Sequence, residues 1–350
     1  MSLEPENIMP VPYQPGKPLE LQVLRNTCGD PLFSQSTTAV ISKMLSMTMS
    51  PVMQVTVTTK SGSTIPAVLK LYDRRFGTDL RDHRNKHVPY TSADEVVFQS
   101  LIQRGDMDRI LQELDEEKKT NIIPPQPWHL LDDVPEGRAK YEVALWQNCV
   151  ENFDCETEAY ARLESFQGKL IPRLYAHVRL ALPDSEVSQG TIASDNLLEQ
   201  SKLARYNEVK GIILELVPGY DLVDLATSPL APSDRETWTS IVQAAIDAAH
   251  DINKHGIILD DCQPRNVLVD CRSQSPFIID LAQCSFKDKL IEVWKDYEEA
   301  EDWDAVYWEF IEQCDNSRAI GGLMTTRLLR TKGFKPDLKY PDCAQVLEVR

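Results

Sequence analysis

The stretch His255-Gly-Ile-Ile-Leu-Asp-Asp-Cys-Gln-Pro-Arg-Asn-Val-Leu-Val-Asp270 sets carboxylates and an amide between two short β-branched runs. Its acidic pair is Asp260 and Asp261, and Asn266 stands five residues after the second aspartate. Further on, Phe277-Ile-Ile-Asp280 ends another apolar run on a carboxylate. We expect the two strand ends to present Asp261, Asn266 and Asp280 to a common space. Two carboxylates and an amide suit Mg²⁺ beside an anionic substrate, because this hard cation prefers oxygen ligands.

Bulk composition narrows the class of protein. The 350 residues are enough for a substantial core and predict two lobes or domains. A formal net charge of −17 argues against a general surface for nucleic acid or an anionic membrane. The eight cysteines contain no Cys-x-x-Cys pair and the histidines have no ligand spacing, so no zinc site is predicted. Without a signal peptide or a long apolar run, we expect an intracellular, reducing location in the cytoplasm or nucleus.

The first part of the chain predicts an arm followed by a β-sheet lobe. Residues 1–36 are expected to be an extended N-terminal arm, because prolines cluster between Pro10 and Pro18 without sustained periodicity. Residues 37–217 are expected to form an N-terminal lobe with an antiparallel sheet. Its first predicted strands are Thr38–Ile41, Met53–Thr59 and Thr64–Tyr72. The last two are separated by a turn at Lys60–Ser63, which predicts a hairpin.

Residues 74–141 are typical of an insertion into this lobe, with mixed charges and several prolines. A short helix from Ser92 to about Arg104 is expected inside it, with Ser92 and Glu95 in capping-box spacing. A long helix is expected from about Tyr141 to Phe166. The residues predicted to share its buried face are Phe153, Glu156, Tyr160 and Leu163, whereas Glu158 and Arg162 are predicted to form an exposed pair.

The remaining chain predicts two further strands and then mostly helix. The strands are expected at Ile171–Leu182 and Val209–Val217, with a polar loop at 183–208 between them. Residues 218–316 are expected to form a helical C-terminal lobe, and residues 317–350 a basic, irregular tail. Its first helix begins with the capping box Ser233-Asp-Arg-Glu236, and an acidic helix is predicted at about Leu290–Cys314.

Several motifs resemble those of the protein-kinase-like superfamily, over roughly residues 38–315. Ala67-Val-Leu-Lys70 resembles the third-strand lysine motif, and Glu156 matches the helix glutamate that pairs with this lysine. Leu214-Glu-Leu-Val-Pro-Gly-Tyr-Asp221 resembles the hinge. Asp261-Cys-Gln-Pro-Arg-Asn266 resembles the catalytic loop, and Asp280-Leu-Ala282 stands in the place of the metal-binding Asp-Phe-Gly.

A narrower resemblance comes from the long helix and the segment after it. Glu-x-x-x-Tyr-x-x-Leu, which ends at Leu163, is followed by Gln167-Gly-Lys-Leu-Ile-Pro-Arg-Leu-Tyr175. This pattern is similar to a large set of fungal kinase-like proteins. The resemblance implies an α+β bilobal fold, with an antiparallel β-sheet lobe carrying one long helix and a mostly helical C-terminal lobe.

The resemblance also implies ATP and Mg²⁺ as cofactors, and a role for each matching residue. Asp261 would be the base that accepts the substrate hydroxyl proton, and Arg265 would direct a positive charge toward the γ-phosphate. Asn266 and Asp280 would hold Mg²⁺. The nucleotide would be held by Lys70 with Glu156 at the phosphates, by Val68 and Leu214 around the adenine, by the backbone of Glu215 and Val217 at the adenine edge, and by Asp221 at the ribose.

The chain also departs from the family pattern. No glycine lies between Gly29 and Gly62, so the glycine-rich phosphate loop is missing. Leu259 stands in place of the usual histidine before the catalytic aspartate, and Gln263 in place of the lysine after it. No Ala-Pro-Glu follows Asp280, which favours small-molecule kinases of the aminoglycoside or choline type over protein kinases. The expected activity is phosphoryl transfer to a hydroxyl of a protein or small molecule; the alternative is a pseudokinase that acts as a binding scaffold.

Several of these residues also have an interpretation without a role in catalysis or nucleotide binding. An isolated Asp-x-x-x-x-Asn is more often a turn or cap, and Lys70 could extend from an edge strand to solvent. Glu95 lies closer in sequence to Lys70 than Glu156 does, although only the helix of Glu156 leads directly into the next strand. Asp221 could simply cap the following helix. Asp260 is expected to be a turn residue and His255 a helix end.

Overall fold

The computed structural model describes residues 7–84, 86–120, 126–132, 136–181, 204–297 and 299–341. The chain divides into two compact units. Unit 1 comprises Met1–Phe153 and Leu174–Glu215, and unit 2 comprises Asp154–Arg173 and Leu216–Arg350. This division differs from the lobes expected from the sequence, because residues before 37 belong to unit 1 and residues 154–173 belong to unit 2.

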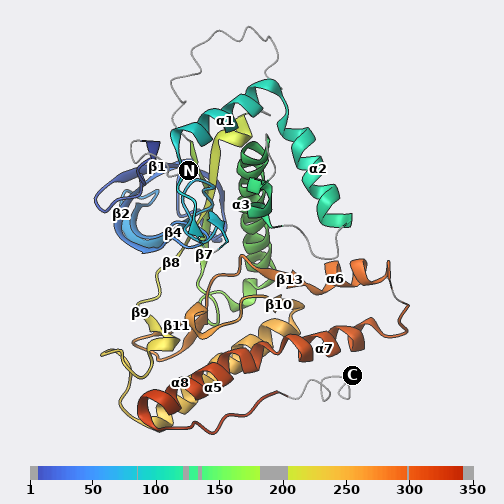
Figure 1. Cartoon of the computed structure of the whole chain (residues 1–350). Helices are drawn as coiled ribbons and strands as arrows, with labels where there is room; N and C mark the ends of the chain where they lie inside the picture. The colour runs from blue at the N-terminus through green and yellow to red at the C-terminus, as the bar shows by residue number, and fades with distance from the viewer. Residues whose placement is uncertain are drawn as a thin grey trace. The chain divides into compact units, whose positions relative to one another are not determined.

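Unit 1 is built on a closed antiparallel barrel with the strand order β1–β2–β3–β4–β8–β7 (Figure 1). Its strands are β1 (Pro18–Asn26), β2 (Ser36–Ser46), β3 (Val52–Thr58), β4 (Thr64–Leu71), β7 (Leu174–Ala181) and β8 (Glu208–Glu215). The side chains that fill the barrel alternate along each strand with those on its outer face. Leu21, Ile41, Val55, Leu69 and Val178 belong to this core and are at most 1% exposed.

The prediction of an extended arm over residues 1–36 is wrong from Pro18 onward. Pro18–Asn26 forms β1, which pairs with β2 on one side and with β7 on the other and so closes the barrel. Leu19, Leu21 and Val23 place apolar side chains at alternate positions, which is the signal of a strand. The prolines upstream concealed this alternation.

The predicted hairpin is present as β3 and β4, joined through Thr59–Ser63. Gly62 has a φ of 83°, so the turn needs a glycine there. Along β4, Leu69 and Leu71 face the barrel core, whereas Val68 and Lys70 lie on the opposite face. Lys70 is nevertheless only 5% exposed. It lies on a central strand of the barrel, between β3 and β8, and not on an edge.

The segment predicted as an insertion has more regular structure than its sequence suggested. It contains β5 (Asp82–His83), β6 (Lys86–His87), α1 (Ser92–Arg104), α2 (Met107–Thr120) and η2 (Pro127–Asp132). The predicted bounds of α1 are correct, but its capping box is made by Thr91 and Asp94 and not by Ser92 and Glu95. The sequence predicted only one helix in this segment, so α2 is an addition to it; Ile110 and Leu114, spaced by four residues, are buried on one face of α2.

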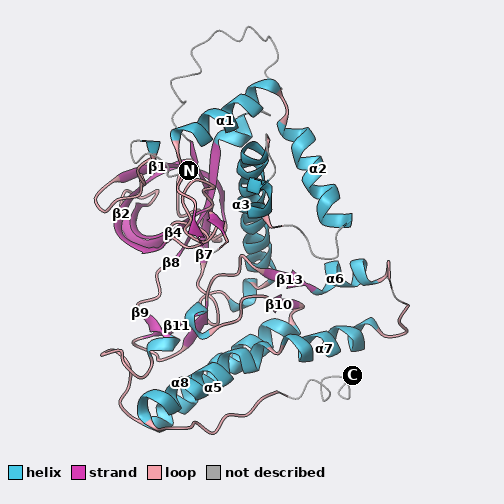
Figure 2. Ribbon diagram, in the orientation of Figure 1, coloured by secondary structure: helices cyan, strands magenta, loops and turns pink. Residues whose placement is uncertain are grey.

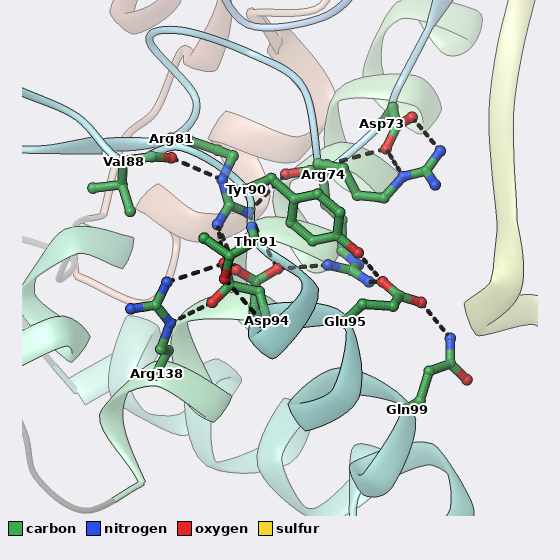
Figure 3. A network of polar contacts seen from close by, with 12 residues as sticks. Asp73, Arg74, Arg81, Val88, Tyr90, Thr91, Asp94, Glu95, Gln99 and Arg138 are labelled. Carbon is green, nitrogen blue, oxygen red and sulfur yellow. Dashed lines mark hydrogen bonds and ion pairs between the residues drawn. The ribbon is translucent and has the colours of Figure 1, made fainter. Parts of the chain in front are cut away.

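A buried polar network binds this segment to helix α3 (Gly137–Arg162) (Figure 3). Arg81 and Glu142 are both fully buried, and Arg81 Nη2 donates to Glu142 Oε1 over 2.7 Å. Arg74 donates to Glu142 Oε2 at 2.5 Å and to Glu95 Oε2 at 2.6 Å. Asp94 accepts hydrogen bonds from Arg138 at the surface end. The whole set, Arg74, Arg81, Asp94, Glu95, Arg138 and Glu142, is called the arginine–carboxylate network below.

Helix α3 has the buried face that the sequence predicted. Phe153, Glu156, Tyr160 and Leu163 are all buried at or next to its C-terminal half. Glu158 and Arg162 form the predicted pair, with Arg162 Nη2 and Glu158 Oε1 2.6 Å apart. The helix ends at Arg162 and a short 3-10 turn, η3 (Glu164–Phe166), follows. Most of the predicted loop at 183–208 lies outside the described residues; its described end holds η5 (Arg205–Asn207).

Unit 2 is mostly helical (Figure 2). Its helices are α5 (Arg235–Lys254), α6 (Lys287–Trp294), α7 (Trp303–Cys314) and α8 (Asn316–Lys332). Its short strands and turns are β9 (Gly219–Asp221), η6 (Leu222–Asp224), β10 (Ile257–Leu259), η7 (Pro264–Asn266), β11 (Val267–Asp270), β12 (Pro276–Ile278) and β13 (Cys284–Phe286). In the described part of the chain, none of the helices is long and apolar enough to cross a membrane.

Three predictions about unit 2 need correction. Asp234, and not Ser233, caps α5 by accepting a hydrogen bond from the Thr237 backbone. The acidic helix expected at about Leu290–Cys314 is two helices, α6 and α7. The tail expected to be irregular contains α8, which packs against α5 (Figure 1). Ile320, Met324 and Leu328, spaced by four residues, are buried on one face of α8 and were the helical signal.

Candidate active site

The loop between β10 and β11 is held at both ends. Gly256, with a φ of 77°, turns the chain out of α5 and into β10, which pairs with β13. At its far end the loop enters the 3-10 turn η7 with Pro264 at the first position, where a missing N–H costs nothing. It then continues into β11, which pairs with both β9 and β12. Residues 260–266 therefore cross between two small sheets.

Within this loop, two side chains donate hydrogen bonds to Asp261. Asn266 Nδ2 donates to both the backbone oxygen and Oδ2 of Asp261, each at 2.9 Å. Arg265 Nη2 donates to Asp261 Oδ1 and Oδ2 at 2.7 and 2.8 Å. Arg265 also donates to the side-chain oxygen of Gln263. The Asp261 carboxylate thus has a fixed orientation, but an exposed arginine covers both of its oxygens.

Asp280 reaches the same place from the end of β12. The Ile279 N–H donates to the Asn266 carbonyl at 2.9 Å, which ties this strand end to the loop. Asp261, Asn266 and Asp280 border one small cavity of about 10 Å³, room for about one water-sized particle. The structure therefore brings together in unit 2 the three side chains that the sequence led us to expect in a common space.

The backbone at Asp280 is unusual for a residue with a side chain. Its φ is 61°, in the left-handed region, which few residues other than glycine and asparagine or aspartate adopt. Such a conformation persists only where the surroundings enforce it, and it recurs at functional sites. Here Leu281, directly after Asp280, is fully buried, so packing holds the backbone next to this conformation.

The donor set fits a hard divalent cation. Asn266 uses its Nδ2 on Asp261, which leaves its amide oxygen as an acceptor. Asp280 is exposed and adds a carboxylate beside the same cavity. Oxygen ligands of this kind are those that Mg²⁺ binds in proteins, usually together with water and phosphate.

Two asparagines that the sequence did not lead us to expect are hydrogen-bonded to the backbone of β10, the strand that precedes the loop. Asn316 accepts from the Leu259 backbone N–H at 3.1 Å and donates to the Leu259 carbonyl at 2.8 Å. Asn253 donates to Asn316 Oδ1 at 2.9 Å and to the Ile257 carbonyl at 2.9 Å. Both side chains are at most 4% exposed. The available signal was Asn253 itself, a polar residue next to Ile252 on the apolar face of α5.

The predicted nucleotide residues of unit 1 lie on two adjacent strands. Val68 on β4 is the direct cross-strand partner of Leu214 on β8, and Ala67 is the partner of Glu215. Val68 and Leu214 are thus neighbours, as a shared adenine slot requires. Lys70 is on the same face of β4 as Val68, and its ammonium lies 5.5 Å from the centre of the Tyr72 ring.

Glu95, the alternative partner for Lys70, is hydrogen-bonded to other residues. Glu95 accepts from Arg74, Gln99 and Tyr90 within the arginine–carboxylate network. Burial alone would raise the pKa of Glu95, but Arg74 and these hydrogen bonds lower it. The carboxylate of Glu95 therefore has a structural function within unit 1.

The other predicted residues lie in unit 2. Glu156 is fully buried on α3, and Val217 is 8% exposed just before β9. Asp221 begins the 3-10 turn η6 but makes no side-chain capping bond, so the capping interpretation is wrong. Partial burial and the neighbouring Asp224 raise the pKa of Asp221. His255 ends α5, as predicted, and its ring contacts Phe166.

Asp260, next to the candidate base, has a partner of its own. Ser285 Oγ lies 3.1 Å from Asp260 Oδ2, and partial burial raises the pKa of this carboxylate. Its backbone N–H donates to the Gln283 carbonyl. The side chain is directed to β13 and does not border the cavity of Asp261, which agrees with a structural residue.

Comparison with known proteins follows this geometry. No family model matches the chain, and no curated protein matches it. Among solved structures it is similar to the apo form of PpkA, with a TM-score of 0.37 and 9% identity over 78% of this chain and 67% of that one.

Two further examples are the PknI kinase domain of Mycobacterium tuberculosis and vaccinia related kinase 3. The first has a TM-score of 0.33 and 14% identity, and the match covers 88% of this chain and 80% of that one. The second has a TM-score of 0.32 and 10% identity, over 82% and 55%. Because these TM-scores are low, the function proposed below rests on the chain's own residues.

Proposed function

We propose that the chain is a kinase-like phosphotransferase, which uses ATP and Mg²⁺ to phosphorylate a hydroxyl of a protein or a small molecule. The observation that carries this proposal is the convergence of Asp261, Asn266 and Asp280 on one small cavity in unit 2. A carboxylate base, an amide and a second carboxylate at two strand ends are the set that phosphoryl transfer requires.

Each residue has a distinct role in this proposal. Asp261 accepts the proton of the substrate hydroxyl, and its orientation is fixed by Asn266, whose Nδ2 bonds both its backbone and its carboxylate. Asn266 and Asp280 hold Mg²⁺ through their oxygens. The bound ion supplies charge neutralisation at the nucleotide phosphates. Positioning matters more than basicity here, because the transition state is loose and gains little from a strong base.

Each unit has its own set of proposed nucleotide-binding residues. In unit 1, Val68 and Leu214 would pack on the adenine, the backbone of Glu215 would bond its edge, and Lys70 would bind the α- and β-phosphates. In unit 2, the resemblance assigns the backbone of Val217 to the adenine edge, Asp221 to the ribose and Glu156 to the lysine. Lys70 is only 5% exposed and Glu156 is fully buried, and a buried charge is stable only with a partner.

Arg265 belongs to the phosphate side of the site. Its Nη2 contacts both oxygens of Asp261, and the side chain is 55% exposed, so its guanidinium is open to solvent. An incoming γ-phosphate competes for the same guanidinium, since bidentate binding of phosphate and of carboxylate are of similar strength. Transfer of Arg265 from Asp261 to phosphate would free the base.

A pseudokinase is the second candidate, and two observations favour it. Arg265 covers both oxygens of the candidate base. The segment before β3, where a flexible phosphate loop is expected, is tied down. Thr78 N–H donates to Met47 O at 2.7 Å, and a Cβ on Gly77 would lie 2.9 Å from Thr48 O.

Thermal unfolding with Mg-ATP separates the two candidates cheaply, when it is paired with an activity assay. A phosphotransferase is stabilised by millimolar Mg-ATP, because a ligand of the native state raises stability. Lys70→Met should abolish the shift, and Lys60→Met, on the solvent-exposed turn of the β3–β4 hairpin, is the matched control. A shift without ATP turnover favours the pseudokinase. Absence of both binding and turnover would contradict the proposed activity.

A further inference from the structure

Two cysteines that have no role in the proposed reaction lie together in unit 2. Cys155 is on α3, one residue before Glu156. Cys284 begins β13, four residues after Asp280. Cys155 Sγ lies 3.4 Å from the carbonyl oxygen of Cys284 and 3.9 Å from that of Leu281, and its thiol donates to both. The contact joins the segment after the candidate metal ligand to the helix of the candidate lysine partner.

Cys155 Sγ therefore contacts the backbone of Cys284 itself, so the two cysteines are neighbours in space. Both residues are partly buried and not enclosed. Interaction with Cys284 lowers the pKa of the Cys155 thiol, and interaction with Cys155 together with burial raises that of Cys284. A thiol with a lowered pKa beside a protonated one is the arrangement of an attacking and a resolving cysteine.

Other cysteines in the described part of the chain have a different environment. Cys149 and Cys262 are buried, and burial raises the pKa of both thiols, that of Cys262 to about 12. Cys28, Cys271 and Cys314 are partly exposed, as the pair is, and burial raises the pKa of the Cys314 thiol. Reactivity toward oxidants should therefore concentrate at Cys155.

We propose that Cys155 and Cys284 form a redox-responsive pair that closes to a disulfide under oxidising conditions. The Cys155 thiolate attacks a peroxide oxygen, the O–O bond breaks, and a sulfenic acid and hydroxide form. Cys284 sulfur then attacks the Cys155 sulfur, the S–O bond breaks, and water leaves. In total two thiols and one hydrogen peroxide give one disulfide and two waters.

Disulfide formation changes the contacts next to the candidate active site. The Cys155 thiol loses its hydrogen, so the carbonyl of Leu281 loses the donor that now holds it. Side-chain rotation must also bring the sulfurs to about 2 Å, which pulls β13 and α3 toward each other. Leu281 directly follows Asp280, so the left-handed backbone at Asp280 is displaced. On this basis, which rests on the proposed function, oxidation lowers phosphotransfer activity.

Peptide mapping of the full chain tests the pair without reference to activity. The protein is treated with hydrogen peroxide, remaining thiols are alkylated, and the digest is analysed by mass spectrometry without reductant. We expect a peptide linked through Cys155 and Cys284 that disappears after reduction. Linkage of Cys155 to another cysteine, oxidation of Cys155 without linkage, or no modification at either residue would overturn the proposal.

Three serine variants supply the controls. Cys284→Ser should prevent the linkage and raise labelling of Cys155 by a sulfenic-acid reagent, because the resolving thiol is missing. Cys155→Ser should prevent both the linkage and the labelling. Cys271→Ser, at a partly exposed position outside the pair, should leave the linkage unchanged. Equal labelling of Cys155 in wild type and in Cys284→Ser would contradict the role of Cys284.

A second arm measures phosphotransfer by reduced and oxidised protein. We expect oxidation to lower activity by roughly tenfold, since even a 1 Å misplacement in an active site can cost a hundredfold. The loss should be reversed by dithiothreitol and absent in Cys284→Ser. If reduced protein has no activity, the proposed function fails while the peptide map still decides on the disulfide. If the linkage forms and activity is unchanged, the regulatory part is wrong.

Discussion

The arginine–carboxylate network of unit 1 and the loop around Asp261 in unit 2 place charged side chains in different settings. In the network, Arg74, Arg81 and Arg138 face Asp94, Glu95 and Glu142, so the charges balance. In unit 2, Asp261 and Asp280 border a small cavity, and Arg265, which contacts Asp261, is exposed. The charges of the network satisfy one another without a ligand. Carboxylates that border a partly exposed cavity are instead suited to binding a cation.

The largest expected effect is on activity, at the loop. Asp261→Ala and Asp280→Ala should each lower phosphotransfer by about a thousandfold, which is the size of effect seen when a key transition-state group is removed. The free energy of unfolding should change far less than activity, because Asp280 is exposed and Asp261 partly exposed; alanine at position 280 adds only the backbone strain of a φ of 61°. The measurement is kcat with the same nucleotide and acceptor for each variant.

Asp260→Asn is the matched control for those variants. Asp260 is the immediate neighbour of Asp261, but it is bonded to Ser285 and does not border the cavity. We expect its activity to stay within a few-fold of wild type. A loss in Asp260→Asn equal to that in Asp261→Ala would mean that the acidic pair has been assigned in the wrong order.

The next effect is on stability, in the network. Glu142→Leu should lower the free energy of unfolding by about 3–5 kcal/mol, because it leaves the buried cations of Arg81 and Arg74 without their shared carboxylate. Urea unfolding followed by circular dichroism measures it. The double variant Arg81→Met with Glu142→Leu should recover part of the loss, since it removes charge and countercharge together. A double variant less stable than both single ones would show that the network is not an ion-pair unit.

A smaller effect, on both stability and activity, is expected at Asn316, which is hydrogen-bonded to the strand before the loop. Asn316→Ala leaves the buried N–H and carbonyl of Leu259 without partners, which costs about 1–3 kcal/mol. Because Leu259 precedes Asp261 by two residues, kcat should also fall, with KM for nucleotide nearly unchanged. Asn316→Asp keeps the acceptor for Leu259 N–H and for Asn253, so it should restore part of kcat. A change in stability alone, with kcat unaffected, would make Asn316 purely structural.

The smallest effect is a difference in pH dependence between the two regions. Although burial raises the pKa of Asp94, its bonds with Arg138 and Thr91 lower it overall, so Asp94 stabilises the fold above the pKa of the unfolded chain, near 4. This contribution is lost as the pH falls through the lowered value. The raised pKa of Asp260 acts in the opposite sense: the ionised group costs stability at neutral pH, and the cost vanishes on acidification.

Thermal unfolding between pH 7 and pH 3 of two asparagine variants measures this difference. Asp94→Asn should be less stable than wild type at neutral pH and should lose less stability in acid. Asp260→Asn should be slightly more stable than wild type at neutral pH, with the advantage disappearing in acid. Parallel curves for wild type and Asp94→Asn would contradict the role given to the network.

The local pattern of the sequence predicted those elements whose stability is local. The β3–β4 hairpin and helix α1 have the expected positions, because turn residues, spacing and burial all favour the same structure there. Helix α8 and strand β1 were missed, although each has a periodic apolar signal. The glycines, prolines and basic residues near these two elements favoured a prediction of irregular structure instead.

The candidate site was predictable only in part, for a physical reason. Asp261, Asn266 and Asp280 lie at the ends of recognisable strands, so their proximity could be expected. The supports could not, because Asn253 and Asn316 are 63 residues apart and meet through tertiary structure. The network has the same property: Arg81 and Glu142 are separated by 61 residues, and nothing local to either indicates a partner.

The closed barrel has a consequence for any attempt to shorten the protein. Strand β1 is hydrogen-bonded on both sides, to β2 and to β7, so the barrel has no free edge. A chain that starts at residue 37, where the sequence placed the lobe boundary, would lose this strand and open two edges at once. Unpaired edges recruit other chains, so such a fragment should aggregate, whereas one that starts at residue 7 keeps the barrel closed.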